Sequence, residues 1–142
     1  MKVNVINDQN IKKIDIKKIK EVVKTVLKQE IGDRSFEINI LITNDNTIKE
    51  YNIYRGKNEP TDVLSFAYGL DEEVIGDIVV SVETIDRQCM EFGNSFEEEF
   101  FYILIHGVLH IVGYDHETSD QDAQTMFELQ DNYFKQLIKL SN

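Results

Sequence analysis

The chain contains three histidines in 142 residues, and all three lie between positions 106 and 116. His106 and His110 are four positions apart in an apolar segment, so on a helix both imidazoles project from one face about one turn apart. Gly113 can adopt the positive φ that ends a helix, which allows the chain to bring His116 back to the same point. Three neutral imidazoles hold one borderline metal ion and leave a fourth position for water. The spacing therefore predicts an open metal site, for which zinc, one ion per chain, is the natural occupant.

Two other interpretations of these histidines are possible. Structural zinc sites usually close with a fourth cysteine or histidine, and the single cysteine, Cys89, is a candidate, although its place in a predicted helix favours packing as a small apolar residue. The same spacing occurs in the metzincin proteases, whose motif HExxHxxGxxH carries a general base after its first histidine. Gly107 occupies that position here, so a peptidase would keep the metal and lose its base. A glycine inside a helix also indicates that another part of the molecule approaches its backbone closely.

The elements that must position these residues alternate between strands and helices. Strands are expected at residues 1–7, 36–42, 63–67 and 75–82, because apolar and β-branched residues recur there between turn signals. Helices are expected at residues 15–31, 44–54, 83–92, 96–112 and 118–140. Residues 1–142 are thus predicted to form a single α+β (or α/β) domain with about four strands and four or five helices.

The helix ends carry recognisable capping residues. Asp15 is expected to cap the first helix, and Ser95 with Glu98 makes a capping box before residues 96–112. That helix is apolar on nearly every side, so we expect it to be central, with the metal site at its end. Thr118 and Gln121 make a second capping box before the last helix.

The charge is strongly uneven along the chain. Its net charge is −11, but residues 1–57 carry +4 and residues 58–142 carry −15. An acidic molecule repels nucleic acid at long range, so an RNA partner requires a local basic face. A stripe of lysines on the first helix offers one, although the solvated back of an amphipathic helix explains it equally simply. The stripe consists of Lys13, Lys17, Lys20, Lys24 and Lys28.

Composition narrows the class of protein. Hydrophobic residues make up 42% and charged residues 29%, which is ordinary for a globular protein and argues against disorder. No apolar run approaches the length of a membrane span, and the first residues do not resemble a secretory signal. A single cysteine excludes an internal disulfide. We therefore expect a cytoplasmic protein with no membrane partner.

Three segments resemble the motifs of the YbeY family, metal-dependent endoribonucleases that take part in ribosomal RNA maturation. They are HGVLHIVGYDH at residues 106–116, YRGKNEPTDVLSF at 54–66 and GDIVVS at 76–81. The resemblance implies a mixed four-stranded sheet with helices packed on it and a zinc ion bound by His106, His110 and His116. It also implies cleavage directed to single-stranded RNA, in ribosomal RNA processing and ribosome quality control. The implied partners are ribosomal RNA and, through it, a ribosomal subunit or its assembly proteins.

Arg55 and His116 are the candidate catalytic residues. Cleaving a phosphodiester develops negative charge on the phosphoryl oxygens, part of which a metal acting as a Lewis acid can take. A guanidinium matches the remaining oxygens with two parallel donors, which an ammonium cannot reproduce. Arg55 also matches the arginine of the family's motif, whereas from its position alone it is equally well an exposed loop residue. Lys57 is a general phosphate contact or simply solvated.

The general base is the least defined part of this prediction. Asp115 and Glu117 flank His116 and could orient an imidazole, and Asp62 could do the same or pair with Arg55. Each is equally well explained as a cap or a solvated carboxylate, and an open metal site needs no separate protein base. A ribosome assembly factor with a mainly structural metal is the alternative that a missing base and an acidic surface favour.

Overall fold

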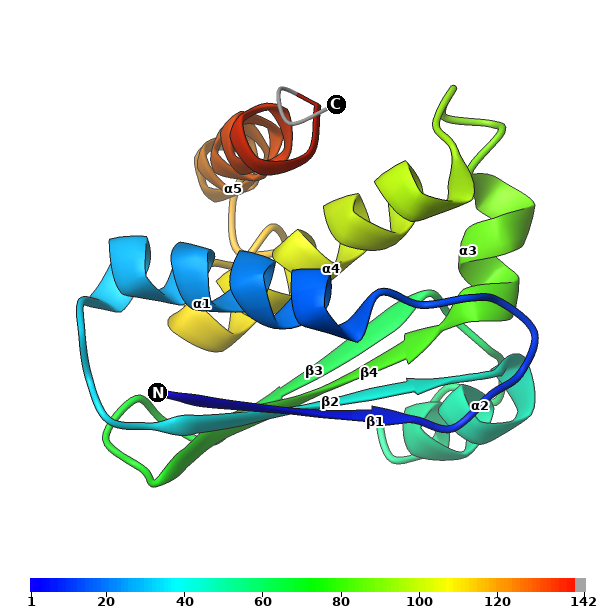
Figure 1. Cartoon of the computed structure of the whole chain (residues 1–142), viewed down its shortest axis with the longest axis horizontal. Helices are drawn as coiled ribbons and strands as arrows, with labels where there is room; N and C mark the ends of the chain where they lie inside the picture. Colours follow the sequence, from blue (N-terminus) through cyan, green and yellow to red (C-terminus); the bar gives the residue numbers. More distant parts are fainter. Residues whose placement is uncertain (140–142) are drawn as a thin grey trace.

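The centre of the molecule is a four-stranded sheet in the order β1-β2-β4-β3, seen in the computed structural model, which describes residues 1–139 (Figure 1). The strands are β1 (Lys2–Asn7), β2 (Glu37–Thr43), β3 (Val63–Ala67) and β4 (Val74–Ser81). β1, β2 and β4 run parallel, whereas β3 pairs antiparallel with β4. The sheet is therefore mixed, as expected, and β1 and β3 form its two edges.

Alternation along β2 determines which face of the sheet is buried. Ile38, Ile40 and Ile42 are at most 1% exposed and belong to the main hydrophobic core. Glu37 and Asn39 alternate with them and stay partly exposed on the opposite face. The regular pattern seen at residues 36–42 thus distinguishes a core face from an outer face.

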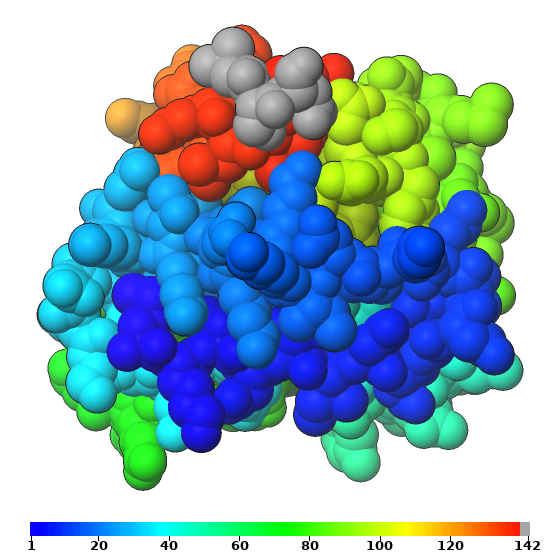
Figure 2. Space-filling view, in the orientation of Figure 1, coloured from blue at the N-terminus to red at the C-terminus, as the bar shows by residue number. Residues whose placement is uncertain are grey.

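The helices are divided unequally between the two faces. α1 (Ile16–Ile31) and α4 (Phe96–Val112) lie on the core face, and α5 (Asp120–Phe134) packs on α4 away from the sheet (Figure 1). Figure 2 shows α1 across the front of the molecule, with the last turns of the chain's described part packed above it. α2 (Asp45–Ile53) lies on the opposite face, at one end of the sheet. α3 (Val82–Gln88) follows β4 directly. The α+β prediction is confirmed.

α1 is the amphipathic helix that its sequence predicts. The side chain of Asp15 caps it by accepting a hydrogen bond of 3.1 Å from the Lys18 N–H. Its buried residues are Ile19, Val22, Val23, Val26 and Leu27. The five lysines of the stripe are all exposed, so the stripe is a solvated face of the molecule.

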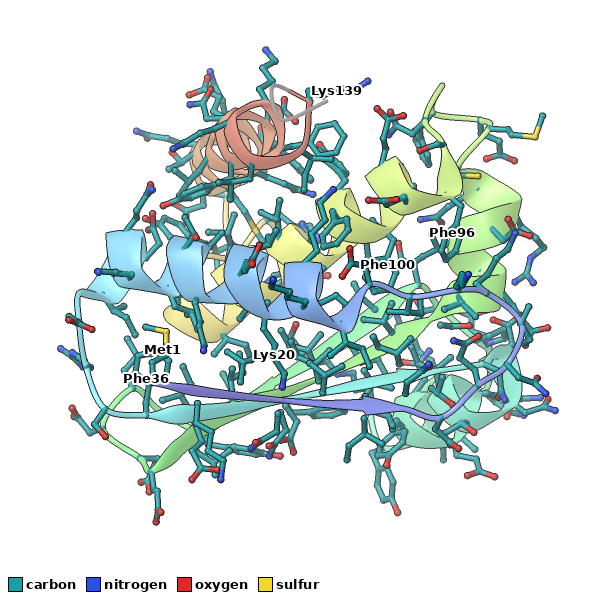
Figure 3. The ribbon with its side chains drawn as sticks, in the orientation of Figure 1. Met1, Lys20, Phe36, Phe96, Phe100 and Lys139 are labelled. Atoms are coloured by element: carbon teal, nitrogen blue, oxygen red, sulfur yellow. The ribbon has the colours of Figure 1, made fainter. Side chains whose placement is uncertain are left out.

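α4 is the central helix of the core, and its capping box is present. The Ser95 hydroxyl accepts from the Glu98 N–H at 3.1 Å, and the Glu98 carboxylate accepts from the Ser95 N–H at 2.9 Å. The rings of Phe96 and Phe100, labelled in Figure 3, pack 6.0 Å apart in its first turns. Among residues 1–139, no helix combines the length and apolarity needed to span a bilayer.

Several boundaries differ from the sequence-based expectation, most of them by one residue. β4 covers Val74–Ser81 rather than residues 75–82. α3 ends at Gln88 rather than at residue 92, because the following turns are exposed and lead into Gly93 at φ 71°. The predicted capping box of Thr118 and Gln121 is wrong.

The cap of α5 lies one residue later than predicted. Ser119 accepts from the Asp122 N–H at 3.0 Å, while the Thr118 hydroxyl donates to the Asp122 carboxylate. Adjacent serine and threonine residues are almost equivalent as caps, so packing decides between them. α5 ends at Phe134 in a π-helical turn, η1 (Lys135–Lys139), and the predicted end at residue 140 lies outside the described residues.

Candidate metal centre

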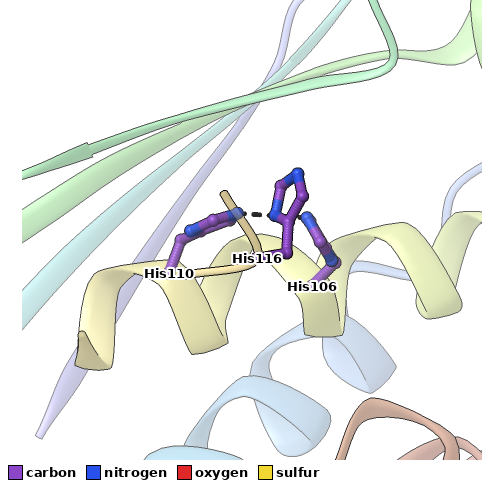
Figure 4. A group of neighbouring side chains, drawn as sticks. All are labelled: His106, His110 and His116. Carbon is purple, nitrogen blue, oxygen red and sulfur yellow. Dashed lines mark hydrogen bonds between the residues drawn. The ribbon is translucent and has the colours of Figure 1, made fainter. Parts of the chain in front are cut away.

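Three imidazoles converge at the C-terminal half of α4 (Figure 4). His106 and His110 come from adjacent turns of the helix, and His116 comes from the loop that follows it. One potential ligand atom from each ring lies within 4.8 Å of the other two. The Nε2 atoms of His106 and His110 are only 3.1 Å apart. The chain therefore places three nitrogen ligands around one point, as the spacing predicts.

A glycine turn brings His116 back to the helix. Gly113 has φ 121°, a conformation that favours glycine, and its N–H donates to the carbonyls of Leu109 and His110. The Tyr114 N–H donates to the Leu109 carbonyl at 3.0 Å, which completes the reversal. Figure 4 shows His116 entering from this loop beside the other two rings.

Gln130 on α5 determines which nitrogen of His106 faces the cluster. Its Nε2 donates to the Tyr102 carbonyl at 2.9 Å, so its Oε1 is the atom 3.0 Å from Nδ1 of His106. An amide oxygen accepts, so Nδ1 must carry the proton and Nε2 keeps its lone pair. Gln130 is 1% exposed, so this hydrogen bond is shielded from water. Such a partner behind a ligand fixes both its tautomer and its orientation.

The surroundings of His106 and His110 favour the neutral form of these two imidazoles, which is the form that binds metal. Burial and, to a smaller extent, the two neighbouring histidines lower the pKa of His110 to about 4, although a backbone hydrogen bond with Tyr114 and the Asp115 carboxylate oppose the shift. Burial also lowers the pKa of His106, against the hydrogen bond with Gln130. His106 and His110 therefore resist protonation.

His116 provides a direct test of whether a metal fits. Its Nδ1 is buried and, among the described side chains, is the only buried nitrogen or oxygen without a hydrogen-bond partner. Leaving a buried acceptor unpaired is costly, and ligation to a metal ion would satisfy it. The three histidines therefore fit a site that binds one metal ion through three nitrogen ligands. Cys89 is not part of the cluster found among residues 1–139 and is buried at the end of α3.

Gly107 is required because α4 lies directly on the sheet. A Cβ atom at this position would lie 3.2 Å from Ile78 Cγ2, 3.2 Å from Ser65 Oγ and 3.3 Å from Val63 Cγ2. The Ser65 hydroxyl also donates to the Gly107 carbonyl at 3.1 Å. The close approach expected from the glycine is therefore made by β3 and β4. The same contacts leave no room for the glutamate of a metzincin protease.

Comparison with known proteins places the chain in a family. A family model described as endoribonuclease YbeY matches residues 4–138. The chain belongs to the endoribonuclease YbeY family. It is 66% identical over 139 residues to the endoribonuclease YbeY of Petrotoga mobilis, covering 98% of this chain and 97% of that protein. It is 43% identical to the endoribonuclease YbeY of Persephonella marina, over 84% of this chain and 81% of that protein.

The fold comparison agrees with the sequence comparison. A Thermotoga maritima protein with a known solution structure superposes with a TM-score of 0.69 at 34% identity, covering 95% of this chain and 88% of that one. The endoribonuclease YbeY of the same organism is 38% identical over 86% of this chain. The resemblance noted in the three sequence motifs is therefore confirmed, and the named relatives are hydrolases that act on RNA.

Arg55, the arginine of the YbeY motif, lies at the free edge of β3. It is exposed in the turn after α2, its Nη2 donates to the Ser65 carbonyl, and its guanidinium lies 5.2 Å from the centre of the Phe66 ring. These contacts are with β3 and not with the histidines. Because Ser65 also contacts Gly107, β3 lies between Arg55 and the helix that carries the metal ligands. The catalytic role of Arg55 stays a prediction.

The candidate bases have other partners. Asp62 accepts from the Val63 N–H at 2.7 Å and from the Gln88 side chain at 3.0 Å, so it does not pair with Arg55. The Asp62 carboxylate still acts on the metal centre, since its charge raises the pKa of His106 against the effect of burial.

The residues after α4 are held by local contacts. Asp115 accepts from the Glu117 N–H at 2.8 Å, as a turn cap does, and the Glu117 carboxylate is 4.0 Å from His116 Nε2. The Tyr114 hydroxyl donates to the Glu30 carboxylate of α1 at 2.8 Å, which agrees with a packing role. A role of Asp115 or Glu117 as general base stays untested.

Two residues that surround the three histidines were not predicted from the sequence, and both lie on α5. They are Gln130 and Phe127, whose ring is 6.0 Å from that of His106 and 5.8 Å from that of His116. The sequence predicts α5 but does not indicate which side of it meets α4. A glutamine on the apolar side of an amphipathic helix is the only local signal that could have identified Gln130.

Proposed function

We propose that this chain is a zinc-dependent endoribonuclease that cleaves single-stranded RNA and acts in the maturation and quality control of ribosomal RNA. The observation that carries the proposal is the His106–His110–His116 cluster, with its unpartnered Nδ1 of His116, in a chain of the YbeY family. Three nitrogen ligands without a fourth protein ligand are typical of catalytic zinc. The proposed site of action is the cytoplasm, and the proposed partners are ribosomal RNA and a ribosomal subunit or its assembly proteins.

The chain's own residues have distinct parts in this proposal. A zinc ion held by the three imidazoles would supply Lewis-acid stabilisation to a phosphodiester. Gln130 keeps Nε2 of His106 free for the metal by holding the proton on Nδ1. Arg55 has five N–H donors, of which Ser65 takes one, so the others remain to bind phosphate oxygens. A bidentate contact of this kind strengthens as the phosphoryl group becomes more negative.

An assembly factor with a structural metal is the second candidate. The net charge of −15 over residues 58–142 favours it, because an acidic surface does not attract RNA. The peptidase interpretation has no such support, because Gly107 provides neither a base nor the space for one.

Metal removal separates the two candidates. Purified protein is stripped with a chelator, mixed with a labelled single-stranded fragment of ribosomal RNA, and then given zinc. A nuclease loses cleavage on stripping and regains it with zinc, and His110→Ala should bind no stoichiometric zinc and cleave nothing. A structural metal would leave cleavage absent in every sample while zinc still raised the stability of the fold.

Arg55 is tested by single-turnover cleavage at saturating enzyme. Arg55→Ala should slow cleavage by about 100- to 1000-fold, by analogy with the loss of one oxyanion donor, and Arg55→Lys should recover little of it. Zinc content should be unchanged in both variants. Arg34→Ala, at another exposed arginine, is the matched control and should cleave at the wild-type rate. A rate for Arg55→Ala within a few-fold of wild type would make this residue an ordinary surface arginine.

A further inference from the structure

The outer face of the sheet carries a groove that the metal centre does not use. Of the helices between residues 1 and 139, only α2 covers the sheet on that side, so many side chains project into solvent (Figure 3). The groove has a volume of about 480 Å³. Its lining includes four aromatic rings, which come from α2, from β3 and from the residues directly after each of them: Tyr51, Tyr54, Phe66 and Tyr68.

These rings are exposed to an extent that packing does not explain. Tyr54 is 85% exposed and Tyr68 is 52% exposed. Phe66 is only partly buried, and its ring lies 6.4 Å from that of Tyr51. Exposed aromatic clusters of this kind usually mark a binding surface.

A line of hydrogen bonds crosses the floor of the groove from β3 to β1. The Tyr68 hydroxyl donates to Asp77 Oδ2 at 2.5 Å, and Asn39 Nδ2 donates to Asp77 Oδ1 at 3.0 Å. Asn4 Nδ2 in turn donates to Asn39 Oδ1 at 2.9 Å. These bonds align amide and carboxylate groups that can pair with the edge of a nucleobase. The Asp77 carboxylate would repel a phosphate, so a backbone could not lie on this floor.

Positive charge is found instead beside the groove, on residues that do not line it. The Arg55 guanidinium lies over Phe66 and is anchored to the free edge of β3. Lys57, two residues further, is exposed and forms no ion pair with any residue between 1 and 139. Aromatic rings on a sheet with cations beside them are the arrangement by which proteins stack the bases of a single strand and hold its phosphates.

We propose that this groove binds single-stranded RNA by stacking bases on Tyr54 and Tyr68, outside the cleavage site. The inference rests on the proposed nuclease function and extends it to a second contact with the same RNA. β3 joins the two regions, since Phe66 faces the groove while Ser65 contacts α4 next to His106. A strand passing over the edge of β3, along Arg55, would connect them. A protein segment is less well suited, because it gains little from isolated rings around a carboxylate floor.

RNA binding to the metal-free full chain tests the groove without requiring cleavage. A 12-nucleotide single-stranded RNA with a fluorescent label is titrated in the presence of chelator, and anisotropy gives the Kd. Tyr54→Ala and Tyr68→Ala should each weaken binding about tenfold, the usual effect of removing one base–aromatic stack. Tyr68→Phe keeps the ring and should stay within about twofold of wild type, because stacking needs no hydroxyl. Phe92→Ala, at a 65% exposed ring in the turn after α3, is the matched control and should change nothing.

The outcomes separate this proposal from the nuclease itself. If the zinc-loaded protein cleaves RNA but both alanine variants bind as tightly as wild type, the groove proposal is overturned and the nuclease stands. If the alanine variants lose affinity but the zinc-loaded wild type cleaves nothing, the groove stands and the nuclease falls. A wild-type dimer in sedimentation that Tyr54→Ala converts to a monomer, without any effect on RNA affinity, would assign the face to a second copy of the chain and also overturn the proposal. Circular dichroism confirms that each variant is folded.

Discussion

Replacing Gln130 by leucine should weaken zinc binding without unfolding the protein. In the wild type, Gln130 Oε1 accepts a hydrogen bond of 3.0 Å from the Nδ1–H of His106 and so keeps Nε2 of that ring free for the metal. Leucine has a similar volume but no acceptor. The proton can then move to Nε2, which lies 3.1 Å from Nε2 of His110 and can donate to it. This alternative tautomer satisfies both rings and occupies both lone pairs.

The expected loss of zinc affinity follows from the changes that zinc binding must reverse in the variant. Zinc binding has to break the new bond and return the proton to Nδ1, where it would face a leucine. A buried N–H without an acceptor costs about 1–3 kcal/mol, and loss of the partner behind a metal ligand typically costs about 10- to 100-fold in affinity. Both considerations predict a Kd raised by about one to two powers of ten. In metal-free Gln130→Leu, no buried N–H of His106 is left without an acceptor. Its free energy of unfolding should therefore differ from that of the metal-free wild type by less than about 1.5 kcal/mol.

The measurement is a competitive titration with a fluorescent zinc chelator. Gln124→Leu is the matched control, because Gln124 is exposed on the same helix and pairs only with the surface residue Glu128. Nitrogen-15 spectra of the imidazoles should show the proton of His106 on Nδ1 in the metal-free wild type and on Nε2 in Gln130→Leu. A zinc affinity for Gln130→Leu equal to that of the Gln124→Leu control would refute the argument from the tautomer.

Four further results are expected. Gly107→Ala should lower the free energy of unfolding in urea by about 1–2 kcal/mol, because crowding on three sides outweighs the helix propensity gained; an alanine variant as stable as wild type would contradict this. In metal-free protein, the His110 imidazole should titrate near its lowered pKa of about 4 in NMR spectra, and a midpoint near 6.5 would be the opposite result. Since its unfolded pKa is higher, the unfolded chain binds more protons, and metal-free stability should fall as the pH decreases from 6.5 towards 4. Zinc at about 100 times its Kd should add about 2.7 kcal/mol to the stability, seen as a higher Tm, whereas His110→Ala should show no such rise.

Local sequence signals were sufficient for most of the fold. The caps at Asp15 and Ser95 and the alternation over residues 36–42 depend on contacts within one or two turns or along one strand, so they can be read without knowing the rest of the molecule. The same holds for the four-residue spacing of His106 and His110. Where two local signals were nearly equivalent, as for the caps at Thr118 and Ser119, the choice was wrong because their energies barely differ.

Only the tertiary structure decided what surrounds these elements. The sequence by itself determined that three histidines meet at the end of a central helix and that Gly107 has a close neighbour. It could not determine that the neighbour is β3, that Gln130 orients His106 across 24 residues of chain, or that Arg55 is anchored to the edge of β3. Such contacts join segments that are distant along the chain, and no local periodicity encodes which faces of two elements pack together. The strand order, with β3 antiparallel at the edge, is what places the metal centre on one face of the sheet and the aromatic groove on the other.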